Sequence, residues 1–219
     1  MSAHCCGHHH EDAGGDPVRQ AAYRRALWWV LAINAIMFGV EIGAGFAAGS
    51  AALQADALDF LGDAANYAIS LFVVGMALRY RAAAALAKGM TMALFGIWVL
   101  GVTAWHEYNG TLPQAFTMGG VGLTALVANA ASFWLLWQYR SGDANMRSAW
   151  ICTRNDVLGN LAVLVAALGV FGTSTGWPDV FVAAAMAMLA LQGAAIVIRH
   201  AKFELHSDMH RAIPDGGVV

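Results

Sequence analysis

Residues 49–63 read GSAALQADALDFLGD, an apolar stretch that carries three carboxylates. Asp56, Asp59 and Asp63 are spaced by three and four residues, so in an α-helix they lie on one face. The apolar character continues to about residue 78, which is long enough to cross a bilayer. A charge in the middle of a bilayer costs about 2.5–3.5 kcal/mol on insertion scales. A membrane helix with three carboxylates on one face is therefore predicted to use them.

The overall composition is that of an integral membrane protein. The 219 residues are 59% hydrophobic and 12% charged, with a mean hydropathy of +0.56, whereas soluble domains carry about 25% charged residues. The net charge of −2 gives no reason to expect nucleic-acid binding. Three cysteines do not suggest a disulfide framework. The sequence also lacks a His-Glu-x-x-His motif and a cofactor fingerprint, so we expect neither an enzyme nor an organic cofactor.

Six apolar segments are each near the length that a bilayer requires. They are Ala26–Ala48, Ala51–Leu78, Ala83–Trp105, Pro113–Tyr139, Ser148–Gly172 and Asp179–His200. Gly49-Ser50 is the only break between the first two segments, which predicts a tight hairpin. We therefore predict an all-α bundle of six transmembrane helices over residues 24–208, with disordered segments at 1–23 and 209–219.

The placement of Lys and Arg predicts the orientation of the bundle. Of the twelve basic residues, all except Arg154 fall before the first span, after the sixth, or in the two loops on that same side. Lys88, with Arg79 and Arg81, is assigned to the loop between the second and third spans. The positive-inside rule makes this side cytoplasmic. We expect a multi-pass protein of the cell (inner) membrane with both termini in the cytoplasm.

The fifth span repeats the pattern of the second. Ser148, Cys152, Asp156 and Asn160 follow one another at intervals of four residues and share a helix face. Polar stripes of this kind face the bundle interior or a water-filled path. Four ligands on two helices, from carboxylates and a thiol, predict a divalent-metal site formed by Asp59, Asp63, Cys152 and Asp156. In the alternative interpretation, these groups pair with one another and only hold the helices together.

The expected ligands pose a question of register. Asp59 and Asp63 fall about a third of the way along their span from the outer side, and Cys152 and Asp156 about a third from the inner side. The two pairs can meet only if the fifth helix extends into the cytoplasm or the second helix lies deeper in the bilayer.

Other polar residues in the spans are candidates for either a proton-linked or a structural role. They are Asn34, Glu41, Asp56 and Asn160. Asp179, at the outer end of the sixth span, is predicted to be an N-cap residue of that helix. The first residues, MSAHCCGHHH, contain six possible accessory metal ligands: His4, Cys5, Cys6, His8, His9 and His10. We interpret this segment as a weak metal collector at the cytoplasmic entrance, with a chance or cloning-derived run as the alternative.

At these residues the chain resembles the cation diffusion facilitator family of metal/proton antiporters. Asn34 and Glu41 resemble the family's N-x-x-x-x-x-x-E in the first helix, and residues 49–63 are similar to its G-S-x-A-L-x-A-D-A-x-H/D-x-x-x-D. Residues 152–160, CTRNDVLGN, are similar to H-x-x-x-D-x-x-G-S, with Cys152 in place of histidine. Trp177-Pro-Asp179 resembles the W-x-D that opens the sixth helix. The resemblance implies that Asp59, Asp63, Cys152 and Asp156 form the transport site.

The resemblance implies a divalent cation/proton antiporter that exports Zn²⁺-like ions from the cytoplasm. Zn²⁺ or Cd²⁺ is the expected substrate, with Co²⁺ and Ni²⁺ as further candidates, and Cys152 points to a softer metal. A homodimer is expected from the family, although its usual C-terminal cytoplasmic domain has no counterpart after the sixth span. The alternative function is a membrane metal sensor or accessory subunit that binds metal without transporting it.

Overall fold

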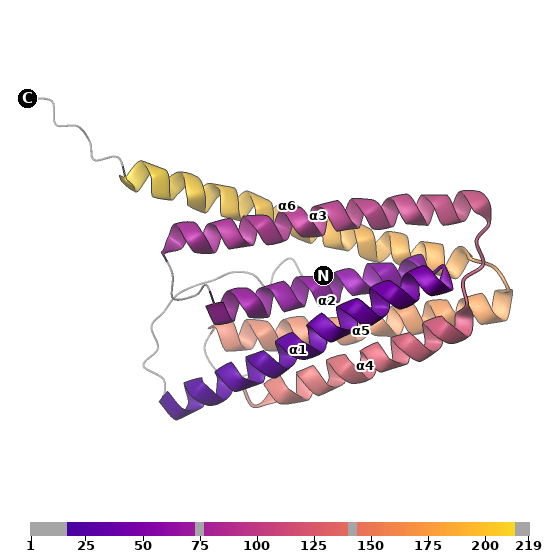
Figure 1. Cartoon of the computed structure of the whole chain (residues 1–219), viewed down its shortest axis with the longest axis horizontal. Helices are drawn as coiled ribbons and strands as arrows, with labels where there is room; N and C mark the ends of the chain where they lie inside the picture. Colours follow the sequence, from indigo (N-terminus) through magenta and orange to yellow (C-terminus); the bar gives the residue numbers. More distant parts are fainter. Residues whose placement is uncertain (1–16, 73–76, 140–143, 213–219) are drawn as a thin grey trace, which may run out of the picture.

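The chain forms a bundle of six α-helices (Figure 1). The computed structural model describes residues 17–72, 77–139 and 144–212, without the side chains of 17, 19, 20, 78, 81, 144–155 and 207–212. The helices are α1 (Pro17–Ala48), α2 (Ala51–Phe72), α3 (Leu78–Asn109), α4 (Ala115–Trp137), α5 (Ala144–Thr173) and α6 (Trp177–Ala212). No strand occurs in these described ranges. The predicted fold class is confirmed.

Two helix ends differ from the prediction. α1 begins at Pro17, inside the segment 1–23 that was expected to be disordered, and α6 continues to Ala212, beyond the expected limit of 208. Both extensions contain charged residues, so they lie beyond the apolar stretch that hydropathy detects. Proline is well tolerated as the first residue of a helix, because the first N–H groups have no partner within the helix.

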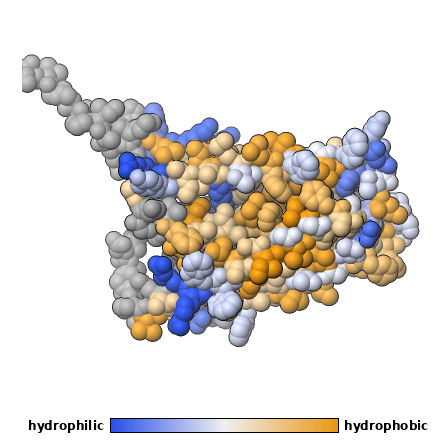
Figure 2. Space-filling model, viewed as in Figure 1, coloured by the Kyte–Doolittle hydropathy of each residue, from blue (hydrophilic) through white to orange (hydrophobic). Residues whose placement is uncertain are grey.

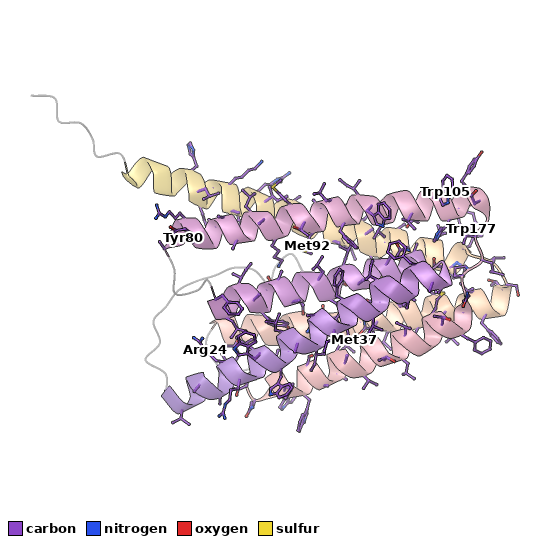
Figure 3. The ribbon with its side chains drawn as sticks, viewed as in Figure 1. Arg24, Met37, Tyr80, Met92, Trp105 and Trp177 are labelled. Atoms are coloured by element: carbon purple, nitrogen blue, oxygen red, sulfur yellow. The ribbon has the colours of Figure 1, made fainter. Side chains whose placement is uncertain are left out.

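Five of the helices are long and apolar enough to cross a membrane: α1, α3, α4, α5 and α6. α2 is the exception because it carries three aspartates within 22 residues. Figure 2 shows hydrophobic side chains along the middle of the bundle and hydrophilic ones towards its ends. Trp105 and Trp177 lie at one end and Arg24 and Tyr80 at the other (Figure 3). This distribution is that of a bilayer-spanning protein with aromatic side chains near both ends of the bundle.

α2 is the central helix of the bundle. It packs against α1, α3, α5 and α6, while α3 and α6 lie side by side as a pair and α4 packs against α1 and α5. Small apolar residues, including Ala51, Ala52 and Ala55, are buried in the first turns of α2. Small residues allow close helix approach where lipid supplies no hydrophobic driving force. The aspartates of α2 therefore face other helices.

The predicted tight hairpin joins α1 to α2. Gly49 adopts φ +64°, a left-handed conformation that glycine takes without steric cost. The Ser50 N–H donates to the Gly45 carbonyl at 2.9 Å and closes the turn. The hairpin places the start of α2 at the end of the bundle where α6 also begins (Figure 1).

Asp179 of α6 caps the N-terminus of α2. Its carboxylate accepts hydrogen bonds from Ser50 Oγ at 2.6 Å, from Ala51 N at 2.8 Å and from Ala52 N at 3.1 Å. Ser50 Oγ in turn accepts from Leu53 N at 3.1 Å. A carboxylate here satisfies N–H groups that have no partner within α2 and interacts favourably with the helix dipole. The expected capping role is thus found on α2, a different helix from the one that carries Asp179.

Candidate metal site

α2 and α5 face each other through carboxylates. The carboxyl groups of Asp63 and Asp156 lie within hydrogen-bonding reach of each other, and each residue is only 6% exposed. Tyr67 Oη donates to Asp63 Oδ2 at 3.1 Å. Among the described residues, Asp156 Oδ2 has no hydrogen-bond donor. Two buried carboxylates in contact repel unless a cation or a proton lies between them.

Asp59 lies beside this pair on the same face of α2. Its side chain is half-buried, and its Oδ2 is 3.5 Å from the position that a Cβ would take at Gly159 of α5. Asp56 Oδ1 is 3.7 Å from the same position. The carboxylates of α2 thus lie close to the backbone of α5, one turn from Asp156. The absence of a side chain at Gly159 leaves this space for them.

The register question is therefore answered. α5 is helical from Ala144, before the predicted Ser148. This earlier start brings Asp156 nearer the middle of α5, and the contact between the carboxyl groups of Asp63 and Asp156 places these two residues at the same level.

The complete ligand set is not brought together in the described part of the chain. No three side chains of His, Cys, Asp and Glu there are close enough to form a metal shell. The side chain of Cys152 lies outside the described residues, although its backbone belongs to α5. The possible accessory ligands His4, Cys5, Cys6, His8, His9 and His10 also lie outside them. The structure thus brings Asp63 and Asp156 together, with Asp59 adjacent.

The assignment of Lys88 to a loop is wrong, and it also conflicts with the predicted third span, Ala83–Trp105, which contains this residue. It lies within α3 and not in a loop, and its Nζ donates to Asn66 Oδ1, one turn after Asp63 on α2. The strong helix formers at residues 82–87, AAAALA, support a helix that begins before Lys88. The structure therefore places a positive charge beside the carboxylates, where none was expected.

A second polar cluster lies in the same interior. Asn160 Nδ2 donates to Asp56 Oδ2 at 2.8 Å, and Asn129 Nδ2 of α4 donates to Asn160 Oδ1 at 2.9 Å. Glu41 of α1 reaches Asp56. Asn129 was not singled out from the sequence, although a lone Asn in an apolar span is a recognisable signal. Asn34 bonds back to the carbonyl of Val30 in its own helix at 2.8 Å, an arrangement that favours the structural interpretation for this residue.

A groove elsewhere has no part in this site. It has a volume of about 420 Å³ and lies between α1, the start of α2 and the end of α3, with Trp98, Trp105 and His106 among its lining residues. None of the lining residues is a carboxylate. The carboxylates of α2 and α5 lie between the packed helices and not in this groove.

Curated relatives are similar to most of the chain. The zinc transporter ZitB of Escherichia coli is 26% identical over 195 residues, which is 83% of this chain and 62% of that protein. The metal cation efflux system protein CzcD of Cupriavidus metallidurans is 25% identical over 205 residues, 88% of this chain and 63% of its own. The cadmium, cobalt and zinc/H⁺-K⁺ antiporter of Bacillus subtilis is 24% identical over 204 residues, 85% and 62% respectively. The chain therefore spans less than two thirds of the length of these relatives.

The family profile covers all or most of each of the six helices that the structure shows. The profile described as the cation efflux transmembrane domain matches residues 27–206, from the first turns of α1 to near the end of α6. This range includes Asp59, Asp63, Cys152 and Asp156. The match extends over more than half of the chain and agrees with its six-helix architecture, and the chain belongs to the cation efflux family.

Proposed function

We propose that this protein is a divalent metal cation/proton antiporter that exports Zn²⁺-like ions from the cytoplasm. The observation that carries the proposal is the contact between Asp63 and Asp156, two buried carboxylates that face each other from α2 and α5. A dication at this point would relieve their repulsion. The names of the relatives, which include a zinc transporter and an antiporter, agree with such a substrate.

The proposed ligands are Asp59, Asp63, Cys152 and Asp156. Asp59 is adjacent to the contacting pair, and Cys152 precedes Asp156 by one turn of α5, so that it belongs to the same helix face. A mixed shell of oxygen and sulfur suits Zn²⁺ or Cd²⁺, with Co²⁺ and Ni²⁺ as weaker candidates, and suits Mg²⁺ or Ca²⁺ poorly.

The proposed ligands link metal to protons by their own chemistry. Carboxylates and a thiol bind a metal ion only when deprotonated, so metal entry releases protons and proton return expels metal. If the bundle exposes the site alternately to the two sides of the membrane, a proton gradient drives metal out of the cytoplasm. The same proposal includes an inner-membrane location, cytoplasmic termini and a homodimer.

Metal flux into proteoliposomes with an imposed pH gradient tests the proposal. Zn²⁺, Cd²⁺, Co²⁺ and Ni²⁺ would be compared with Mn²⁺ as a harder control ion, while an internal dye reports proton movement. We expect uptake of Zn²⁺ and Cd²⁺ with protons moving in the opposite direction. Stoichiometric metal binding without flux would instead identify a sensor or accessory subunit, and the absence of both would remove the metal assignment.

Cys152 is expected to set the choice between soft and borderline metals. In Cys152→His, an imidazole replaces the thiolate, and the ratio of Cd²⁺ to Zn²⁺ transport should fall about tenfold, because sulfur favours Cd²⁺ more strongly. Competition between the two metals in the flux assay measures this ratio. Cys5→Ser with Cys6→Ser is the matched control, and unchanged selectivity in Cys152→His would remove Cys152 from the ligand set.

Lys88 is expected to weaken metal binding. Its ammonium group donates a hydrogen bond to Asn66, which lies one turn from Asp63 on α2. A positive charge at this position opposes the approach of a dication. Lys88→Gln should therefore bind Zn²⁺ about fivefold more tightly, a gain of about 1 kcal/mol. Titration of the purified protein measures the affinity, with Lys202→Gln on the exposed part of α6 as control. Weaker binding in Lys88→Gln would show that Lys88 positions the site through Asn66.

A further inference from the structure

A second pair of buried carboxylates lies outside the proposed metal ligands. Glu41 of α1 is 0% exposed and Asp56 of α2 is 1% exposed, and their carboxyl groups are within hydrogen-bonding reach of each other. Among the described residues, neither oxygen of Glu41 meets a hydrogen-bond donor, and Asp56 Oδ1 meets none either. These acceptors thus lie in or beside a contact between two carboxyl groups that is closed to bulk solvent.

The surrounding contacts hold Asp56 in this position. Its other oxygen, Oδ2, accepts from Asn160 Nδ2 at 2.8 Å, and Asn160 is itself held by Asn129 at 2.9 Å. α2, α4 and α5 therefore fix one side of the Asp56 carboxylate and leave its Oδ1 for Glu41. A purely structural polar network would be expected to satisfy all its buried members. In this network Asn129 Oδ1 also has no donor among the described residues, and the two carboxyl groups are its only ionisable members left in that condition.

The neighbouring carboxylates make it still less favourable for Glu41 and Asp56 both to be charged. Asp59 and Asp63 follow Asp56 on α2, and Asp156 faces them from α5. α4 contributes only the neutral amide of Asn129. Lys88 of α3 is the one nearby cation in the described residues, and its ammonium group is bound to Asn66, on the far side of Asp63 from Asp56. Two adjacent carboxylates in a bilayer interior cannot both remain charged without a cation.

We propose that Glu41 and Asp56 bind one proton between their carboxyl groups, and that this proton leaves when metal binds at the neighbouring site. The direct approach of the two carboxyl groups suits a shared proton better than a larger alkali ion. Asp56 precedes the proposed ligand Asp59 by one helical turn, so a dication there repels the proton. Glu41 and Asp56 then form a site for the exchanged proton, and this site is separate from the metal ligands. This inference rests on the proposed function.

Isothermal calorimetry of Zn²⁺ binding tests the inference. Titrations of the full-length purified protein in buffers of different ionisation enthalpy give the number of protons released for each Zn²⁺ bound. Glu41→Gln should release about one proton fewer than the wild type, with its Zn²⁺ affinity kept within about threefold. Glu107→Gln removes an exposed carboxylate at the end of α3 and should match the wild type. Equal proton release in Glu41→Gln and the wild type would overturn the inference.

A second measurement covers the case in which Glu41→Gln does not fold. Infrared difference spectra on Zn²⁺ addition should show loss of a protonated-carboxyl band in the wild type, and this loss should be absent in Asp56→Asn. Persistence of the band change in Asp56→Asn contradicts the proposal. If added K⁺ or Na⁺ weakens Zn²⁺ binding in the wild type and not in Asp56→Asn, the site holds an alkali ion and the proton assignment is wrong. Absence of Zn²⁺ binding in the wild type would instead contradict the proposed function.

Discussion

Asn in place of Asp63, or of Asp156, is expected to abolish metal flux in proteoliposomes. Each change removes one charged ligand and leaves a neutral amide of nearly the same shape, so the helices should stay packed. Loss of one carboxylate from the contacting pair should cost on the order of 3 kcal/mol of metal binding, which corresponds to about 100-fold in affinity. Flux and equilibrium Zn²⁺ binding should fall together.

The control for this experiment is Glu107→Gln, since Glu107 is exposed at the end of α3 and touches no proposed ligand. Thermal unfolding in detergent should be similar for all three variants and the wild type. If Asp63→Asn or Asp156→Asn folds normally and transports at the wild-type rate, the contact between α2 and α5 is not the transport site.

Asp179→Ala is expected to destabilise the bundle by about 2–4 kcal/mol. The change removes a buried carboxylate that accepts from Ser50 Oγ, Ala51 N and Ala52 N, and hydrogen bonds to a charged group contribute about 1.5–3 kcal/mol each before relaxation. The N–H groups at the start of α2 would be left without this acceptor. Denaturant titration in detergent micelles would show the loss as a lower unfolding free energy.

The matched comparison for Asp179 is Ser50→Ala. It removes one donor of the same cap and one acceptor for Leu53 N, so a loss of about 1 kcal/mol is expected. An Asp179→Ala protein that loses no more stability than Ser50→Ala would contradict the view that this carboxylate anchors α2 to α6.

The sequence was sufficient to predict the number of helices and the side chains that face inward. Apolar runs mark the part of each helix that crosses the bilayer, and intervals of three and four residues in the second and fifth spans identify a polar face on each. The contact between Asp63 and Asp156 follows from these two faces. The ends of α1 and α6 could not be predicted in the same way, because a helix that leaves the bilayer no longer requires apolar residues.

The remaining contacts depend on register between helices, which local spacing does not encode. Lys88 reaches Asn66 because α3 packs against α2. Asp179 lies in the first turn of α6 but caps α2, since the hairpin at Gly49 brings the start of α2 to the same end of the bundle. Asn129 joins the cluster of Asp56 only because α4 packs against α5. Each of these contacts joins distant parts of the chain.

X-ray absorption of the Zn²⁺-loaded protein tests the central claim most directly. In a Cys5→Ser, Cys6→Ser background, the account predicts one bound Zn²⁺ with a mixed shell of oxygen and a single sulfur at about 2.3 Å. The sulfur should disappear in Cys152→Ser, and binding itself should be lost in Asp63→Asn. A shell without sulfur in the background protein, or an unchanged shell in Asp63→Asn, would contradict a metal ion shared by α2 and α5.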